Sequence, residues 1–306
     1  MQELREDVFS GKSVIINEAR GKRPQQFKSQ LSDIDKDCFF CLGNEDKTPT
    51  ASLVISEDPW QGRVVPNKFP IVNDQGSIRG YHEVVIESNR HHDNYFNMTQ
   101  EDFERIIRMY KHRYLAYIKD DTVKYVSIFK NHLREAGASL EHPHSQIIGL
   151  PIIPKDVEEE FLRCQTFALT HQKSLHQQVM EKEIKENKRV IHDSFNFLVL
   201  APYASLFNYE IQIIYKQTKA FDQLREEEVC ELAGIYEKLF EGLYVKVGNV
   251  PFNMFFHFYP IPSKCDFYHW HIHVTPRLSM QAGFELSTGI YVNSVSPEQV
   301  ANDLKW

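Results

Sequence analysis

The stretch YHEVVIES at residues 81–88 decides the fold of this 306-residue chain, because NYEIQIIYK at 208–216 repeats its pattern. Glu83 and Glu210 hold the same place in the two stretches. Both stretches alternate in polarity and are rich in β-branched residues, a pattern that predicts a β-strand in each. The match is the first sign of an internal repeat.

Each half contains the same series of elements in the same order. An apolar run that breaks at a proline precedes the strand, and an amphipathic helix, a second strand and a histidine motif follow it. In the first half these are RVVPNKFPIV (63–72), a helix after Thr99, KYVSIFKN (124–131) and HPHSQ (142–146). In the second half they are LVLAPYASLF (198–207), a helix over 229–243, PFNMFFHF (251–258) and HWHIH (269–273).

The two histidine motifs repeat with the same spacing as the strands, since His142 is as far from His269 in the sequence as Glu83 is from Glu210. The alternative, that amphipathic units of this kind look alike by chance, stays open. We expect an α+β fold of two tandem units, each an antiparallel sheet with packed helices. The expected boundaries are 1–154 for the first half, 155–190 for a helical connector and 191–306 for the second half. Ser296-Pro297-Glu298-Gln299 predicts a capping box that opens a last short helix.

Composition excludes several classes of protein. With 42% hydrophobic and 25% charged residues the chain is ordinary globular protein, and no apolar run reaches the roughly 18 residues of a membrane span. The net charge of −7 argues against a general nucleic-acid or anionic-membrane binder. The charged start MQELREDVFSGK lacks the apolar core of a signal peptide, and the five cysteines are thinly spread. We therefore expect a cytoplasmic protein without a disulfide framework.

The motif HPHSQ combines groups that suit chemistry at phosphorus. In a strand, His142, His144 and Gln146 would point to one face. A neutral imidazole can attack phosphorus while a neighbour fixes its tautomer, and the amide can steady charge on the non-bridging oxygens. The alternative is a buried histidine pair in a core strand, and the motif alone does not decide between them.

Cys38-Phe39-Phe40-Cys41 is the only CxxC in the chain, and it has three interpretations: half of a zinc site, a redox pair, or chance. Without a second CxxC, a zinc site would need histidines or a carboxylate from elsewhere. His91 or His92 and His142 are the candidates. A redox pair would instead require a reactive thiol of low pKa at Cys38.

Several motifs together resemble the galactose-1-phosphate uridylyltransferase family of the histidine-triad superfamily. They are CFFC, RVVPNKFP, GYHEVVIES, the following His91, HPHSQ and the late AGFELSTG. The late segment is also similar to the plant ADP-glucose phosphorylase branch, and the resemblance covers nearly the whole chain. It implies two histidine-triad-like halves, which agrees with the repeat. Glutamine at the last position of HxHxQ is typical of the superfamily's nucleotidyltransferases, whereas hydrolases usually carry histidine there.

The resemblance also implies roles for individual residues. His144 would be the nucleophile, Gln146 would contact the transferred phosphoryl group, and Ser139 would lie beside it. Residues implied around the nucleotide, its phosphates and the sugar or acceptor are Arg20, Arg23, Asn67, Asn131 and Glu285. A structural zinc would be bound by Cys38, Cys41, His91 and His142. A second site for zinc or iron would use Glu160, His257, His271 and His273.

The chain departs from the family pattern in two places. The segment HLREA is inserted between Asn131 and Gly137, next to the implied phosphate site, where it bears on the choice of acceptor. The connector has Cys164 but not the cysteine pair of the phosphorylase branch.

The interpretation of the whole sequence is a nucleotidyltransferase of the uridylyltransferase type. It would move a nucleoside monophosphate between a nucleotide sugar and a sugar 1-phosphate or phosphate through a covalent nucleotidyl-histidine. The alternatives are a phosphorylase or hydrolase of ADP-sugars or dinucleoside polyphosphates, and a non-catalytic nucleotide-binding zinc protein. Nucleic acid and membrane are not expected as partners, and a homodimer is consistent with the family.

Overall fold

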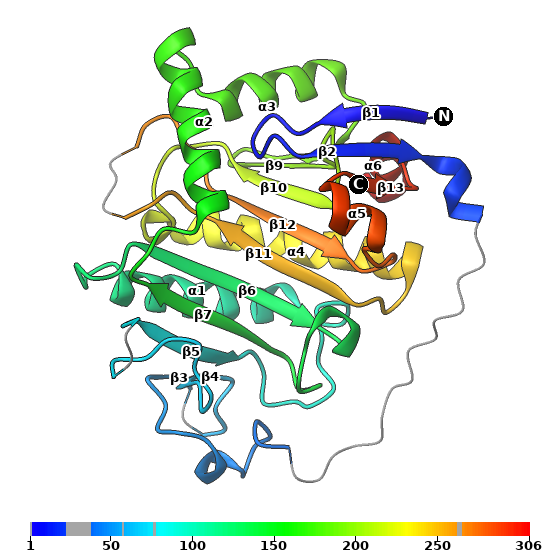
Figure 1. Cartoon of the computed structure of the whole chain (residues 1–306). Helices are drawn as coiled ribbons and strands as arrows, with labels where there is room; N and C mark the ends of the chain where they lie inside the picture. The colour runs from blue at the N-terminus through cyan, green and yellow to red at the C-terminus, as the bar shows by residue number, and fades with distance from the viewer. Residues whose placement is uncertain (1, 23–37, 57, 76–77, 262–264) are drawn as a thin grey trace.

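Ten strands form one continuous sheet through the middle of the molecule (Figure 1). The computed structural model describes residues 2–22, 38–56, 58–75, 78–261 and 265–306. The strands lie in the order β3-β4-β5-β7-β6-β11-β12-β10-β9-β8, and all neighbouring pairs are antiparallel. In chain order their bounds are β3 Leu53–Ile55, β4 Gly62–Pro66, β5 Tyr81–Ile86, β6 Tyr125–His132, β7 His144–Leu150, β8 Val190–Asp193, β9 Phe197–Leu200, β10 Ile211–Tyr215, β11 Phe252–His257 and β12 His271–Pro276.

The strand order is symmetrical about the β6–β11 pair, and this confirms the two α+β halves. The strands β3 to β7 of the first half correspond in order to β8 to β12 of the second. One helix follows the third strand in each half, α1 (Gln100–Tyr117) or α4 (Glu226–Val247). Because β6 and β11 pair with each other, the repeat extends a single sheet instead of building two separate ones.

The pairing register corrects the single repeat spacing expected from the sequence. Val84 of β5 pairs with Gln146, and Gln212 of β10 pairs with His273. Since Gln146 and His273 hold the same place in the histidine motifs, Val84 and Gln212 are equivalent in the strands. The strands β5 and β10 are therefore one residue further apart in the sequence than the two histidine motifs are. A difference of one residue reverses the face to which a strand side chain points.

The counterpart of Glu210 is consequently His82 and not Glu83. Glu83 lies on the helix side of the sheet, where its carboxylate accepts a 2.7 Å hydrogen bond from Arg113 of α1. Glu210 lies on the opposite side, 3.1 Å from the ring of His273. The two glutamates align by spacing in the sequence but occupy opposite faces of the sheet.

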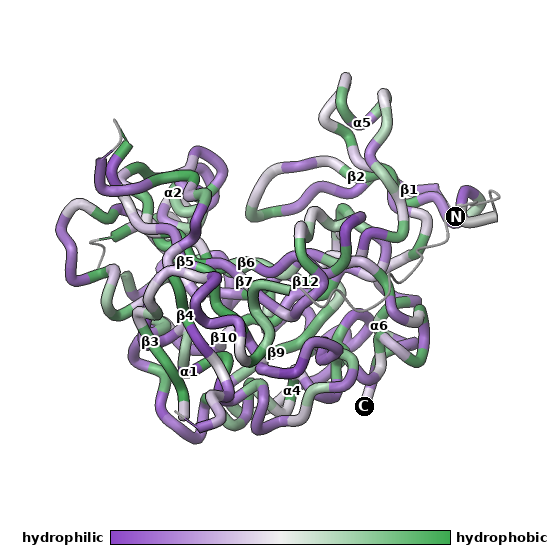
Figure 2. Tube along the Cα trace, turned by 90° about the horizontal axis from the view of Figure 1, so that it is seen from below, coloured by the Kyte–Doolittle hydropathy of each residue, from purple (hydrophilic) through white to green (hydrophobic). Residues whose placement is uncertain are grey.

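The main core lies between the sheet and the helix pair α1 and α4. Thr99 caps α1 through a capping box with Asp102, as the sequence predicts. Phe103 of α1 stacks on Phe240 of α4 with ring centroids 6.2 Å apart. The buried apolar cluster runs through both halves, and the helix pair leaves the opposite face of the sheet for other segments (Figure 2).

The opposite face carries the connector and a small second sheet, whereas the last helix of the chain packs against α4. The connector forms α2 (Lys155–His171) and α3 (Leu175–Glu186), and a three-stranded sheet joins β1 (Gln2–Glu6), β2 (Ser13–Asn17) and β13 (Tyr291–Asn293). The helix α5 (Gly283–Thr288) projects beside β2, and α6 (Pro297–Leu304) ends the chain (Figures 1 and 2). Among the described residues, no helix combines the length and apolar character needed to cross a membrane.

The last helix begins after Ser296 as expected, but the predicted capping box does not form. The Ser296 side chain makes no cap hydrogen bond. Gln299, the third helical residue and the expected partner in the box, instead donates a 3.0 Å hydrogen bond from its side-chain amide to Asp303. The neighbouring Glu298 carboxylate accepts hydrogen bonds from Arg5 at 3.2 Å and Arg189 at 2.8 Å, which tie the start of the helix to β1 and to the residue before β8.

Candidate functional site

The histidine motif of the first half lies at the start of β7. His144 is the first residue of the strand, opposite Ile86, and His142 lies before it. The sequence analysis expected His142, His144 and Gln146 to share one face of a strand. This holds for His144 and Gln146, but His142 lies outside the strand. Pro143, which has no N–H to offer a sheet ladder, separates the two histidines.

The ring of His144 is held in one tautomer. Its Nδ1–H donates a 2.8 Å hydrogen bond to the backbone carbonyl of His142, which leaves the lone pair on Nε2. Burial lowers the pKa of His144, so the imidazole is neutral at neutral pH. The Phe40 ring lies at its edge, with centroids 5.6 Å apart. A neutral imidazole with an available Nε2 is the form that a nucleophile requires.

His82, a residue that the sequence analysis missed, orients Gln146. Its Nδ1 accepts a 3.0 Å hydrogen bond from the Ile71 N–H, so its Nε2–H donates to Gln146 Oε1 at 2.8 Å. The side-chain amide of Asn67 lies 3.1 Å from the same ring nitrogen. With its oxygen engaged, the Gln146 amide keeps its two N–H groups for another acceptor. The repeat distance between β5 and β10 is one residue longer than that between the histidine motifs. An alignment of the two strands at this distance would have identified His82 as the counterpart of Glu210.

Four residues gather beside this strand with the donor set of a metal site. The ligand atoms of Cys38, Cys41, His91 and His142 all lie within 4.8 Å of one another. His92, the other candidate, is outside the group. The sequence places these four residues far apart, and the end of β5 and the start of β7 bring the two histidines together.

The ring of His142 is already oriented for a ligand role. Its Nε2–H donates a 2.8 Å hydrogen bond to the Ser88 carbonyl, and its Nδ1 faces Cys41 Sγ at 3.7 Å. Burial lowers the pKa of His142 to about 4, which keeps the ring neutral. A backbone acceptor that fixes the tautomer is the usual support of a metal-binding histidine.

A buried ion pair lies directly behind His144. Lys130 Nζ donates to Glu87 at 2.5 Å and to the His144 carbonyl at 3.1 Å, and the two charged side chains are 2% and 0% exposed. Glu87 also accepts from the hydroxyls of Tyr95 and Tyr110, at 2.8 and 3.2 Å. The sequence analysis assigned Lys130 only to a strand and gave no sign of this pair.

The second half has two aromatic residues at the positions equivalent to this ion pair. β5 pairs with β7 in the first half as β10 pairs with β12 in the second, and this shared register makes Tyr215 the counterpart of Glu87. β6 pairs with β7 as β11 pairs with β12, which makes Phe256 the counterpart of Lys130. Both aromatic side chains are buried. The fold therefore accommodates an uncharged pair here, and the ion pair is particular to the half that contains His144.

Two residues implied near the nucleotide lie at the end of β6 and in the loop that follows it. Asn131 accepts a 2.8 Å hydrogen bond from Asn253 of the neighbouring half. Asn253 also donates to the carbonyl of Ala136, at 2.7 Å, so it holds the inserted HLREA segment against the sheet. Ser139 lies in the same loop, before β7.

Two other residues implied to contact the substrate, Arg20 and Glu285, lie away from β7. Arg20 and Glu285 line one small cavity of about 240 Å³ between β2 and α5. The carboxylate of Glu285 accepts a 2.9 Å hydrogen bond from the Ala282 N–H at the start of α5. Arg23 lies outside the described residues.

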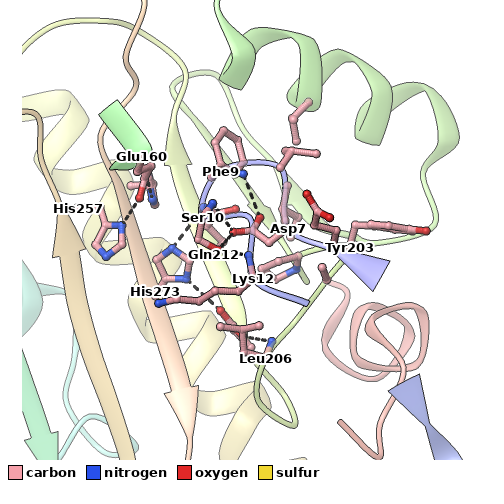
Figure 3. A pocket seen from close by; sticks show the side chains of 18 of the residues that line it. Asp7, Phe9, Ser10, Lys12, Glu160, Tyr203, Leu206, Gln212, His257 and His273 are labelled. Atoms are coloured by element: carbon pink, nitrogen blue, oxygen red, sulfur yellow. Dashed lines mark hydrogen bonds and ion pairs between the residues drawn. The ribbon is translucent and has the colours of Figure 1, made fainter. Parts of the chain in front are cut away.

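The second histidine motif contributes to another cluster of possible metal ligands. His257, His271 and His273 present ligand atoms within 4.8 Å of one another. The carboxylate of Glu160 lies 2.8 Å from His257 (Figure 3). It also lies 3.5 Å from His271. Burial raises the pKa of Glu160, but the neighbouring imidazoles outweigh this and hold it well below its usual range. The structure thus brings the four residues implied for the second site together.

This second cluster lies at the wall of a cavity of about 530 Å³. The loop between β1 and β2, which includes Phe9 and Lys12, closes the cavity from one side (Figure 3). His273 donates through Nδ1 to Glu210, and the Gln212 amide lies 3.4 Å from its Nε2. Burial raises the pKa of Glu210 to about 7. Glu210 therefore orients His273 as His82 orients Gln146.

The chain is similar over nearly its full length to known proteins. The family described as a domain of unknown function, DUF4921, matches residues 80–305. ADP-glucose phosphorylase of Arabidopsis thaliana is 31% identical over 99% of this chain and 92% of that protein. Galactose-1-phosphate uridylyltransferase of Thermotoga maritima is 28% identical over 100% of this chain and 98% of that protein. The crystal structure of the Arabidopsis thaliana ADP-glucose phosphorylase with bound ADP-glucose matches with a TM-score of 0.88 and 28% identity, over 100% of this chain and 99% of that one.

Proposed function

Because this chain belongs to the family of galactose-1-phosphate uridylyltransferase and ADP-glucose phosphorylase, we propose that it is a nucleotidyltransferase with His144 as its nucleophile. It moves a nucleoside monophosphate between a nucleotide sugar and either a sugar 1-phosphate or inorganic phosphate. The geometry of His144 carries the proposal, since Nδ1 is bonded to the His142 carbonyl and Nε2 keeps its lone pair. A protein that only bound nucleotide would not require this arrangement.

The reaction proceeds by two displacements at phosphorus. In the first, the Nε2 lone pair of His144 attacks the α-phosphorus, an N–P bond forms, and the bond to the bridging oxygen breaks. The bridging electrons leave with the sugar 1-phosphate, and the Nδ1–H keeps its hydrogen bond to the His142 carbonyl. The Gln146 amide donates to the non-bridging oxygens as charge develops there. In the second displacement an oxygen of the acceptor phosphate attacks, and the N–P electrons return to His144.

The remaining substrate contacts follow the positions of the implied residues. Asn67 and Asn131 contact the nucleotide, and Ser139 lies beside its phosphates in the loop before β7. Arg20 and Arg23 also contact the nucleotide and its phosphates, and Glu285 lies near the sugar or the acceptor phosphate. This assignment gives the catalytic step to the first half, residues 1–154. Apart from the substrate contact of Glu285, it leaves the connector, 155–190, and the second half, 191–306, in a structural role.

Two thiols and two imidazoles form the S₂N₂ donor set of a structural zinc, and Cys38, Cys41, His91 and His142 fit it. Bound zinc would hold the His142 ring, and the carbonyl of the same residue binds His144 Nδ1. The metal is thus linked to the nucleophile through one residue. In the second half, Glu160, His257, His271 and His273 would hold zinc or iron. That half has histidine at the position of Gln146, so its metal is assigned a structural role.

The combined variant Cys38→Ser/Cys41→Ser is expected to lose about one zinc per chain and to unfold at a lower temperature than the parent. The reason is that the binding energy of a structural zinc contributes to folding energy. Elemental analysis and a thermal melt measure the two effects. Cys265→Ser, which changes a thiol outside the described metal groups, is the control and should keep its zinc. A parent protein purified without zinc would contradict the assignment.

The donor and acceptor can be identified by one experiment. The protein is incubated with a panel that includes UDP-glucose and ADP-glucose, and its intact mass is measured. A mass increase of one nucleoside monophosphate names the base. Galactose 1-phosphate and inorganic phosphate are then compared as acceptors that discharge the adduct. If no donor forms an adduct, the proposed covalent mechanism is wrong.

A second candidate reaction, phosphorolysis of an ADP-sugar, is favoured by one observation. The plant relative named ADP-glucose phosphorylase is 31% identical to this chain, against 28% for the Thermotoga maritima uridylyltransferase. The protein would then form an adduct with adenosine monophosphate, and inorganic phosphate would discharge this adduct faster than a sugar 1-phosphate does. That result would favour phosphorolysis.

A further inference from the structure

His176 is a buried histidine whose role the proposed reaction leaves open. It is the second residue of α3 in the connector and has no solvent exposure. Its Nδ1 faces Cys164 Sγ at 3.8 Å, and its Nε2 is buried without a hydrogen-bond partner in the structure. An unpartnered polar atom in the interior costs about 1–3 kcal/mol, so its presence calls for a ligand.

This unpartnered nitrogen belongs to a side chain that lies next to the second-half cluster. Ligand atoms of Glu160, His176 and His271 lie within 4.8 Å of one another, and the rings of His176 and His271 are 5.2 Å apart. His271 donates its Nδ1–H to the His269 carbonyl at 3.1 Å, which leaves Nε2 as its ligand atom. His271 is also a member of the group with His257 and His273. The two groups therefore adjoin one another through His271.

The ring of His176 is also fixed in place. Phe9, from the loop between β1 and β2, stacks on it with centroids 4.4 Å apart. Tyr268 meets its edge at 4.9 Å and donates a 2.6 Å hydrogen bond to Glu160. With the proton on Nδ1 toward the Cys164 sulfur, the Nε2 lone pair is free to bind a cation. A second polar group that sets the tautomer is typical of a ligating histidine.

We propose that His176 is a ligand of the second-half metal ion, adding a donor from the connector to those of Glu160, His257, His271 and His273. This inference rests on the second metal of the proposed function. Its consequence is that the ion ties α2 and α3 to the sheet.

Metal content and affinity test the proposal in the full-length protein. Wild-type protein should hold two equivalents of metal, and His176→Phe should keep the first and bind the second at least about 10-fold more weakly in a chelator competition. Phenylalanine keeps the aromatic contact with Phe9 but has no ligand atom. His171→Phe, which changes an exposed histidine at the end of α2, is the matched control and should bind as wild type does. Equal affinity in His176→Phe and wild type would overturn the proposal.

A near-isosteric pair separates a ligand role from a packing role. His176→Cys offers a thiolate to the ion, whereas His176→Ser offers a much weaker donor in almost the same shape. Tighter metal binding by the cysteine variant supports ligation, and equal binding by the two variants refutes it. If wild-type protein holds only one equivalent of metal, the second site itself is wrong. If it holds two and His176→Phe also holds two with equal affinity, only the inference on His176 fails.

Discussion

Replacing His144 by glycine is expected to abolish the covalent adduct while the protein stays folded. The imidazole supplies the nucleophilic atom of the first displacement, and its Nε2 is the ring nitrogen that the 2.8 Å bond to the His142 carbonyl leaves unprotonated. The adduct of the parent protein should be acid-labile, as a phosphoramidate is, and the kinetics should be ping-pong. Intact mass after incubation with the donor measures the adduct, and circular dichroism checks the fold.

The internal repeat supplies a matched comparison for this experiment. His271 occupies the equivalent position in the second half, and its Nδ1 donates to the His269 carbonyl in the same manner. His271→Ala should lower the thermal stability, yet its folded fraction should still form the adduct. Adduct on the His144→Gly variant would refute the nucleophile assignment. Loss of transfer in folded His271→Ala would show that both halves take part in the chemistry.

Replacing Lys130 by methionine is expected to lower the free energy of unfolding by about 3–5 kcal/mol, because it leaves the buried carboxylate of Glu87 without its counter-charge. Glu87 would keep only its hydrogen bonds from the two tyrosines, in a site from which water is excluded. The Lys130 bond to the His144 carbonyl would also be lost. Urea unfolding followed by circular dichroism measures the effect.

The double variant Lys130→Met/Glu87→Gln tests whether the unpaired charge of Glu87 causes the loss of stability. The glutamine still accepts from both tyrosines but carries no charge, so the double variant should be more stable than Lys130→Met alone. Lys238→Met removes an exposed ion pair with Glu241 and should change stability by no more than about 0.5 kcal/mol. A Lys130→Met loss no larger than that of Lys238→Met would contradict the prediction.

Local pattern allowed the sequence to predict the order of elements and part of the site. Strand alternation and helical spacing depend on neighbours in the chain, so the two α+β halves and the helix after Thr99 were predictable. The expected zinc ligands came from the family resemblance, and the structure brings Cys38, Cys41, His91 and His142 together. The resemblance also gave His91 over His92, a choice that the residue pattern alone left open, and the structure places His92 outside the group.

The sequence by itself determined the repeat, the α+β class and the residue types that gather around His144. Only the tertiary structure decided how the two halves correspond, because a shift of one residue in the alignment reverses the face of a strand. It therefore decided that His82 orients Gln146, that Lys130 meets Glu87 behind His144, and that His176 reaches the second cluster. Each of these contacts joins residues from different elements. Their approach depends on register and helix packing, which no spacing along the chain encodes.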